Sequence, residues 1–219
     1  MMRRMGSSLR SERQLKCSEA FDLSEGYEGL GPGGRALRVS SRELLHNDVA
    51  FARGEARPTE PIEFVRDEGR TPHDVVGTTY ASLILVSERF LDVLREHRFS
   101  GWATFPVRVF LDEGTELDGY HGFAVIGRAG PIDDSLSEEV ILPPPAPHGR
   151  ARRGLRGACF PAESWDGSDV FACGESSAIT VTEAVKQALE EAEITDVAFK
   201  RLSEIERIWR ADGSLIAAE

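Results

Sequence analysis

The hydrophobic pattern of the chain repeats once, in two segments that begin at Ile84 and Ile179. The segments read ILVSERFLDVLREHRFSGW and ITVTEAVKQALEEAEITDV. In each, a run of apolar and β-branched residues leads into Ser or Thr and then Glu, after which apolar residues recur every three or four positions. The run is typical of a strand and the recurrence of an amphipathic helix. The pattern therefore predicts a strand–helix–strand unit used twice, over about 83–111 and about 178–205.

Both predicted helices have a marked start. Ser87 and Thr182 are placed as N-cap residues, whose side-chain oxygens accept hydrogen bonds from free N–H groups of the first turn. Glu88 and Glu183 follow and put negative charge at the positive end of the helix dipole. The predicted apolar stripes are Phe90, Leu91, Leu94 and His97 in the first helix, and Val185, Ala188, Leu189 and Ala192 in the second. We expect the two stripes to pack around one core.

Other segments of the chain predict additional strands and one loop. Residues 60–69 alternate between apolar and polar, as a strand does. Residues 102–111 and the apolar run 123–127 predict a β-hairpin. The Pro-rich segment 138–157 carries four arginines and is typical of a long exposed loop. The spacing in 199–210 indicates a strand followed by a helix.

These elements indicate an α+β fold: one compact domain of two similar strand–helix–strand units plus a β-hairpin, with a poorly ordered N-terminus. A chain of 219 residues can bury a core of that size. The N-terminus is basic and lacks the apolar centre of a secretory signal. We expect a flexible segment over 1–15 and a single domain over 16–219. No apolar run approaches the roughly 20 residues that span a bilayer. We expect a cytoplasmic protein with no membrane partner.

The net charge of the chain narrows the class of partner. The net charge of −11 argues against binding to nucleic acid, which depends on Lys and Arg, and suits a basic protein partner.

The three cysteines, Cys17, Cys159 and Cys173, are an odd number without CxxC spacing. The spacing indicates neither a disulfide framework nor a zinc cluster, so we expect reduced, unpaired thiols and no structural metal.

Motifs for a bound cofactor are weak. GLGPGG at 29–34 formally satisfies the dinucleotide pattern GxGxxG, but no apolar strand precedes it and Pro32 lies inside the turn. A loop explains the segment better. The chain contains no GxxxxGK[ST], HExxH or GxSxG sequence. We expect no cofactor.

The segment GYHG at 119–122 is the most suggestive short motif. Its two glycines predict a hairpin tip at which Tyr120 and His121 are exposed. A histidine there would serve as a general base if a carboxylate lay beside it. Contact with a partner and plain turn structure are the other two interpretations.

Acidic residues and one tryptophan complete the candidates. Asp133, Asp134, Glu138 and Glu139 cluster after a glycine–proline pair, without the alternating ligand spacing of a calcium loop. Trp165 is either an exposed anchor for a partner or a locally packed loop residue. The residues that we predict to contact a partner are Asp112, Glu113, Tyr120, His121, Asp133, Asp134, Glu138, Glu139 and Trp165.

Three stretches together resemble a known family. They are LILVSERFLDVLREHRFSGWATFPVRVF, GYHGFAVIGRAGPID and SSAITVTEAVKQALEEAEITDVAFKRL. Over roughly 60–205, the chain is similar to the bacterial immunity-protein family numbered eleven in polymorphic-toxin systems, in its myxobacterial-type branch. The resemblance implies an α+β protein that binds and neutralises a cognate toxin, with no catalytic residues and no required cofactor. Some similar proteins carry paired CxxCG motifs, whereas this chain has only Cys173–Gly174 and an isolated Cys159.

The leading hypothesis is therefore a non-catalytic, cytoplasmic immunity protein whose toxin is basic and encoded by an adjacent gene. One alternative is an enzyme that uses His121 with a nearby carboxylate. Another is a self-associating structural or regulatory module, and a homodimer is compatible with either binding role. The sequence by itself names neither the toxin nor the binding face.

Overall fold

The computed structural model describes most of the chain. The described residues are 15–26, 35–41, 43–44, 47–80, 83–112, 114–144, 149–209 and 215–217. The predicted flexible segment lies outside them except for Leu15, and the glycine-rich segment 29–34 and Glu113 also lie outside.

The first sheet has seven strands, and six of them close into a ring. Its strands are β2 (Arg38–Ser40), β3 (Ile62–Glu68), β4 (Val75–Thr78), β5 (Ile84–Ser87), β6 (Trp102–Asp112), β7 (Thr115–Leu117) and β8 (Tyr120–Val125). The ring closes because β3 pairs with β2 on one side and, in parallel, with β6 on the other. β7 pairs with β6 outside the ring. The predicted antiparallel pairing is confirmed, since Trp102 of β6 lies opposite Val125 of β8, but the segment predicted as the turn contains β7 and the start of β8.

The ring has its own apolar interior. Alternate residues of its strands, among them Val39, Phe64 and Leu85, are buried there. The short helix α1 (Asp48–Ala52) packs against the same cluster. Gly122 leaves room for the ring of Phe105, because a Cβ at this position would lie 2.1 Å from that side chain. The second glycine of GYHG thus has a packing role.

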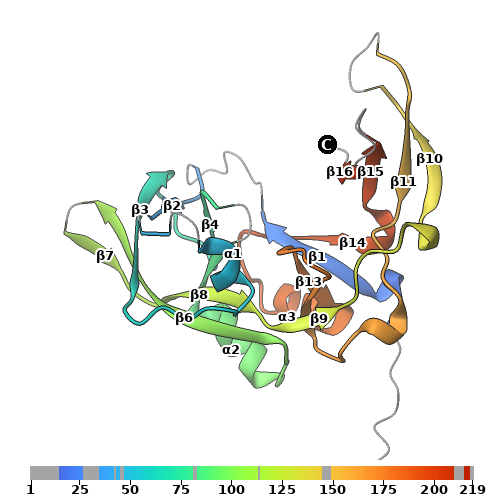
Figure 1. The fold of residues 1–219 in the computed structure, drawn as a ribbon. Coiled ribbons are helices and arrows are strands. Elements are labelled where there is room, and N and C mark those ends of the chain that lie inside the picture. The colour runs from blue at the N-terminus through green and yellow to red at the C-terminus, as the bar shows by residue number, and fades with distance from the viewer. Residues whose placement is uncertain are drawn as a thin grey trace, which may run out of the picture.

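The second sheet has five strands. Its order is β14 (Val197–Arg201), β1 (Ala20–Glu25), β13 (Ile179–Thr182), β12 (Val170–Cys173) and β9 (Gly127–Ala129). The pairs that involve β1 and β13 are antiparallel, whereas β12 and β9 run parallel. The chain therefore leaves the first sheet after β8 and enters the second at β9 (Figure 1).

Two helices fill the space that the two sheets share. They are α2 (Glu88–Glu96) and α3 (Glu183–Glu191), which contact each other. One apolar cluster includes Phe90 and Leu94 of α2, Val185 and Leu189 of α3, and residues of both sheets. The prediction of two strand-into-helix units around one core is confirmed, since each helix begins one residue after the expected cap.

Two details of the predicted helices are wrong. Ser87 accepts a hydrogen bond from the Phe90 amide at 3.1 Å, but the Thr182 side chain makes no cap bond. Its hydroxyl is buried on β13 and has no partner among the described residues. His97 is exposed and stacks on Phe99, because α2 ends before it, and Val93 takes its place in the buried stripe.

A third sheet stands away from the rest of the molecule (Figure 1). Its order is β10 (Glu138–Leu142), β11 (Arg152–Arg156), β15 (Glu206–Trp209) and β16 (Leu215–Ala217). The segment predicted as a loop is therefore a β-hairpin in its described part. In register, Glu138 lies opposite Arg156, and the pair forms an ion bridge of 3.5 Å. Cross-strand pairs of opposite charge support the strands in spite of their polar sequence.

The predicted helix after residue 199 is also wrong. The segment forms β14, a short turn and β15 instead, because its apolar residues find partners on two different sheets. The short 3-10 turns of the described chain are η1 (Cys17–Glu19), η2 (Asp134–Leu136), η3 (Ala162–Ser164) and η4 (Leu202–Glu204). The chain is one compact α+β domain, as predicted.

The cysteine prediction is corrected by the structure. Cys17 and Cys159 form a disulfide, with their Cα atoms 5.2 Å apart although 142 residues separate them in sequence. They meet because η1 and the segment after β11 pack around a third apolar cluster, which contains Phe160 and Phe171. Cys173 is free and buried, and burial raises the pKa of its thiol to about 11.

We predict that the disulfide contributes substantially to stability. Replacing Cys17 with Ser should lower the free energy of unfolding by about 2–5 kcal/mol, because the cross-link restricts a long loop of the unfolded chain. Urea unfolding with and without dithiothreitol provides the control, since reduction should destabilise the wild type and leave the variant unchanged. Three free thiols per unfolded, unreduced wild-type chain, rather than one, would contradict the assignment.

Candidate functional site

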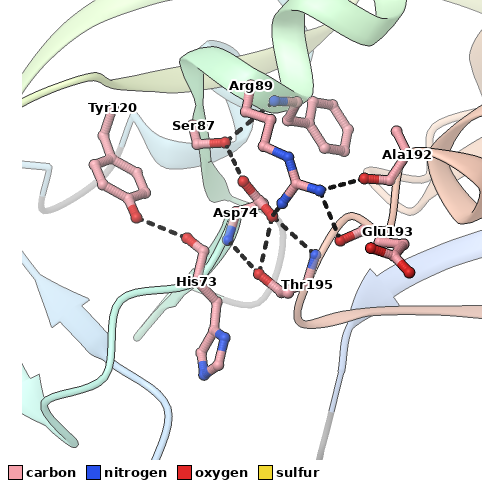
Figure 2. A network of polar contacts seen from close by, with 9 residues as sticks. His73, Asp74, Ser87, Arg89, Tyr120, Ala192, Glu193 and Thr195 are labelled. Atoms are coloured by element: carbon pink, nitrogen blue, oxygen red, sulfur yellow. Dashed lines mark hydrogen bonds and ion pairs between the residues drawn. The ribbon is translucent and has the colours of Figure 1, made fainter.

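One buried carboxylate joins the two repeat units. Asp74 precedes β4, and its side chain is only 10% exposed. Its Oδ1 accepts a hydrogen bond from Ser87 Oγ at 2.7 Å (Figure 2). Its Oδ2 accepts from Arg89 Nη1 at 2.9 Å, and from the amide and hydroxyl of Thr195 at 3.0 and 2.9 Å. The first unit supplies Ser87 and Arg89, and the second supplies Thr195.

The same residues bind the main chain of both units. The Asp74 amide donates to Thr195 Oγ1 at 3.0 Å, and the Asp74 carbonyl accepts from the Ser87 amide at 2.8 Å. Arg89 Nη2 donates to the carbonyl oxygens of Ala192 and Glu193, just beyond the end of α3 (Figure 2). Arg89, in the first turn of α2, thus donates hydrogen bonds to carbonyl groups at the C-terminal end of α3.

Burial raises the pKa of the Asp74 carboxyl, but the bonds from Thr195 and Ser87 and the charge of Arg89 outweigh this effect. The pKa of Asp74 therefore lies below its ordinary value. A buried charge of this kind is tolerated because its acceptor sites are filled by donors.

A cavity lies at the other end of β4 and has a volume of about 290 Å³. It is lined by residues 22–25 of β1, by Arg38 and Thr78, by Tyr80, Leu83 and Ile84, and by residues 177–179. The lining thus comes from both repeat units. The cavity is the candidate binding site that the fold itself creates.

Three charged residues line the cavity. Arg38 donates to the Thr78 carbonyl at 2.8 Å and lies 3.8 Å from Glu25 Oε1. Glu25 lies directly on the backbone of Gly77, where a Cβ would come within 1.3 Å of its carboxylate. Burial raises the pKa of the third residue, Asp22, and the charge of Lys200 partly lowers it.

The predicted hairpin tip is a strand in the structure. Tyr120 and His121 are the first two residues of β8, because they pair with Ser87 and Val86 of β5. Tyr120 donates a hydrogen bond to the His73 carbonyl at 2.7 Å, and burial raises the pKa of its phenol to about 12. Tyr120 therefore has a local packing role next to Asp74 (Figure 2).

His121 does have a carboxylate neighbour. Its Nε2 atom lies 2.7 Å from Glu88 Oε2, on the surface at the first turn of α2. Arg95 also binds Glu88, and this bond is the largest cause that lowers the pKa of the Glu88 carboxyl. The three side chains form an ion-paired surface cluster, and none of them lines the cavity.

The predicted acidic contact residues fall into two distant groups. Asp134, Glu138 and Glu139 lie at the third sheet, where Arg207, Arg156 and Arg153 pair with them at 2.7, 3.5 and 3.1 Å. Asp133 accepts a bond from the Ser135 amide at 2.9 Å and holds η2. Asp112 is the last residue of β6 and pairs with Arg66 at 2.8 Å. β7, which follows it, lies on the opposite side of the molecule from the third sheet (Figure 1). The structure does not bring the two groups together.

Trp165 is packed locally. Its ring is half-buried and lies 6.1 Å from that of Phe171, and its indole N–H donates to the Ser168 carbonyl at 2.9 Å. Contact of Trp165 with a partner stays a prediction.

Sequence reasoning missed Asp22 and Asp74. The signal for Asp22 was available, since it is a carboxylate inside the apolar strand sequence AFDL. The signal for Asp74 was weaker, because HDVV looks like an ordinary turn before a strand. Its importance depends on Thr195, which is 121 residues away.

The described part of the chain contains no group of three or more His, Cys, Asp and Glu side chains arranged to hold a metal ion. Its helices are all too short or too polar to cross a membrane.

Comparison with known families identifies the class. The profile of an immunity protein family matches residues 20–204, from the first residue of β1 to the end of η4. No curated protein matches the chain at a significant level. The match covers both sheets of the repeat units and two strands of the third sheet, β10 and β11, so the chain is an immunity protein in class. It belongs to the Imm11 immunity protein family.

Membership confirms the resemblance read from the sequence and extends it toward the N-terminus. It suggests a toxin-neutralising function, and proteins of this class are generally non-catalytic.

We predict that Asp74 contributes stability only in its ionised form. Asp74→Asn should lower the free energy of unfolding at pH 7 by about 2–4 kcal/mol. The reason is that the groups which donate to the Asp74 carboxylate would then face a neutral amide instead of a negative charge. The lowered pKa means that this contribution is present above the unfolded value and is lost as the pH falls through the folded value, below about pH 4.

The difference in the free energy of unfolding between the wild type and the Asn variant should therefore shrink in acid. Urea unfolding at a series of pH values measures this difference. Asp92→Asn is the matched control, because Asp92 is an exposed residue of α2 with one surface ion pair. A constant deficit between pH 3 and pH 7 would show that the charge of Asp74 is not the cause.

Proposed function

We propose that this protein protects the cell that makes it by binding a cognate toxin directly in the cytoplasm, without turnover. The observation that carries the proposal is the family match over 20–204, which includes every residue of the Asp74 network and of the cavity. We further propose that the toxin is basic and is encoded by an adjacent gene.

Electrostatics supports a basic partner. A net charge of −11 attracts a basic domain from solution and raises the rate of encounter. We propose Asp112, Glu113, Asp133, Asp134, Glu138 and Glu139 as contributors to this attraction. Glu138 and Glu139 are the best placed among the described ones, because their side chains are 69% and 77% exposed.

The enzyme alternative rests on one observation, the contact between His121 and Glu88. A carboxylate that already binds Arg95 is a weak orienting partner for a catalytic histidine, since its charge is shared. His121→Ala should accordingly leave protection intact. Loss of protection in a variant that still folds and still binds the toxin would favour the enzyme.

The proposed function is tested by co-expression. The product of each neighbouring gene is expressed alone and with this protein, and growth is measured. We expect one neighbour to be toxic alone and harmless in the pair, and the purified pair to elute as a stable complex whose mass is measured by light scattering. The mass of the free protein decides between a monomer and a homodimer.

Absence of any toxic neighbour, or rescue without a complex, would contradict direct neutralisation.

We predict that the exposed acidic strand speeds association. Changing Glu138 and Glu139 to Gln should slow association with the toxin about twofold or more at low salt and flatten its salt dependence. Stability should change little, because exposed ion pairs contribute about 0–1 kcal/mol. The matched variant changes Glu190 and Glu191 of α3 to Gln, which removes the same charge from another face. Slower association in the α3 variant alone would move the interface to that helix.

A further inference from the structure

We propose that the cavity between the repeat units receives a Lys or Arg side chain of the toxin, with the Asp22 carboxylate as its counter-ion. This inference rests on the proposed function, because it assumes a basic protein partner. It assigns a position to one contact of that partner.

The size of the cavity suits a single side chain. Its volume of about 290 Å³ lies just below the range of about 300–1,000 Å³ that is typical of small-molecule sites. A side chain that enters from a protein partner needs no more space than this. It is also anchored by its own backbone, so the site does not have to enclose it.

The lining matches the two parts of a cationic side chain. Lys and Arg have an apolar stem and a charged head, and they bury the stem along apolar surface. The residues that line the cavity include the apolar Leu83, Ile84 and Ile179 and the acidic Asp22 and Glu25. Charge and apolar lining therefore occur together in one hollow.

Of the two acidic residues that line the cavity, Asp22 is the one available to an occupant. Glu25 is matched by Arg38, which is itself held by the Thr78 carbonyl. Among the residues that the structure describes, no donor bonds to the Asp22 carboxylate. Lys200 lies opposite Asp22 in the register of β1 and β14 and acts on it only through its charge.

Asp74 provides the internal comparison. Asp74 joins the two units, whereas Asp22 lies on β1 between β13 and β14; both aspartates lose solvent on folding. Donors fill the acceptor sites of Asp74, and its pKa is lowered; Asp22 has no such donors, and its pKa is raised. A partly buried carboxylate without donors is costly for the free protein, and a cation from a partner removes that cost.

The strand that carries Asp22 is held on both sides before binding. β1 is an inner strand of its sheet, paired with β13 and β14, and η1 immediately before it carries the disulfide to Cys159. A carboxylate on a fixed strand loses little freedom when it is bound, which favours affinity.

The first arm of the test needs no toxin. The ¹⁵N-labelled protein is titrated with N-acetyl-arginine amide and N-acetyl-lysine amide to about 100 mM, because a single side chain binds only weakly. N-acetyl-norleucine amide, which has the stem but no charge, is the control. We expect the cationic probes alone to shift the amides of Ser24, Thr78 and Ala178, and Asp22→Asn to abolish the shifts.

The second arm measures the affinity for the toxin identified by co-expression. Asp22→Asn should weaken binding at least about tenfold. Ala178→Phe, which narrows the cavity from an exposed position, should do the same. The controls are Asp118→Asn and Ala198→Phe, two exposed positions outside the cavity lining. Because the raised pKa makes ionised Asp22 unfavourable for folding at neutral pH, the thermal midpoint of the Asn variant should be unchanged or higher.

The two arms separate the possible failures. If the wild type binds a toxin and both cavity variants bind it equally well, the inference is overturned and the proposed function stands. If no neighbour is a toxin, the proposed function fails, and absence of the probe shifts then overturns the cation site as well. Loss of affinity together with a lower thermal midpoint would assign Asp22 a structural role instead.

Discussion

The carboxylate of Asp74 is the contact on which the arrangement of the two repeat units depends. A charge that leaves water without partners is strongly unfavourable, and Ser87, Arg89 and Thr195 supply the donors that offset this cost. Those donors come from both units, and they fix the start of α2 against the end of α3. The apolar cluster between the sheets supplies most of the driving force, but it is not directional. The polar network is what selects one relative position.

That position has consequences for the rest of the molecule. The six-stranded ring protects the edges of the first unit, because each of its strands has neighbours on both sides. The second sheet packs beside it along β1 and β4, and β4 runs from the Asp74 network at one end to the cavity at the other. The cavity is therefore a product of how the two sheets meet, since both contribute residues to its lining.

Membership in the Imm11 family and the distribution of charge bear on function in different ways. The family indicates what kind of partner to expect, whereas the structure shows which acidic residues are already engaged. Glu138 and Glu139 pair with arginines of the neighbouring strand but keep most of their side-chain surface exposed to solvent. Asp22 is the contrasting case of a carboxylate with few partners of its own. Long-range attraction and a specific contact can thus be served by different residues of one acidic protein.

The sequence by itself determined the elements whose signals are local. The start of α2 at Glu88 and of α3 at Glu183 was predictable because an N-cap residue, an acidic first turn and a 3.6-residue apolar period all lie within a dozen positions. The pairing of β6 with β8 followed from alternation, and the family resemblance followed from the same segments. Tertiary structure decided what depends on distant residues. Cys17 meets Cys159 across 142 positions, and Asp74 meets Thr195 across 121.

The polar segment from 138 to 157 also needed its fold to become a hairpin, because its strands are held by cross-strand ion pairs that periodicity does not reveal. Likewise, His121 belongs to a strand rather than a turn because it pairs with Val86 of β5. Local sequence specifies the conformation of a segment, whereas the partner of a buried charge or thiol is set by which segments the common core brings together.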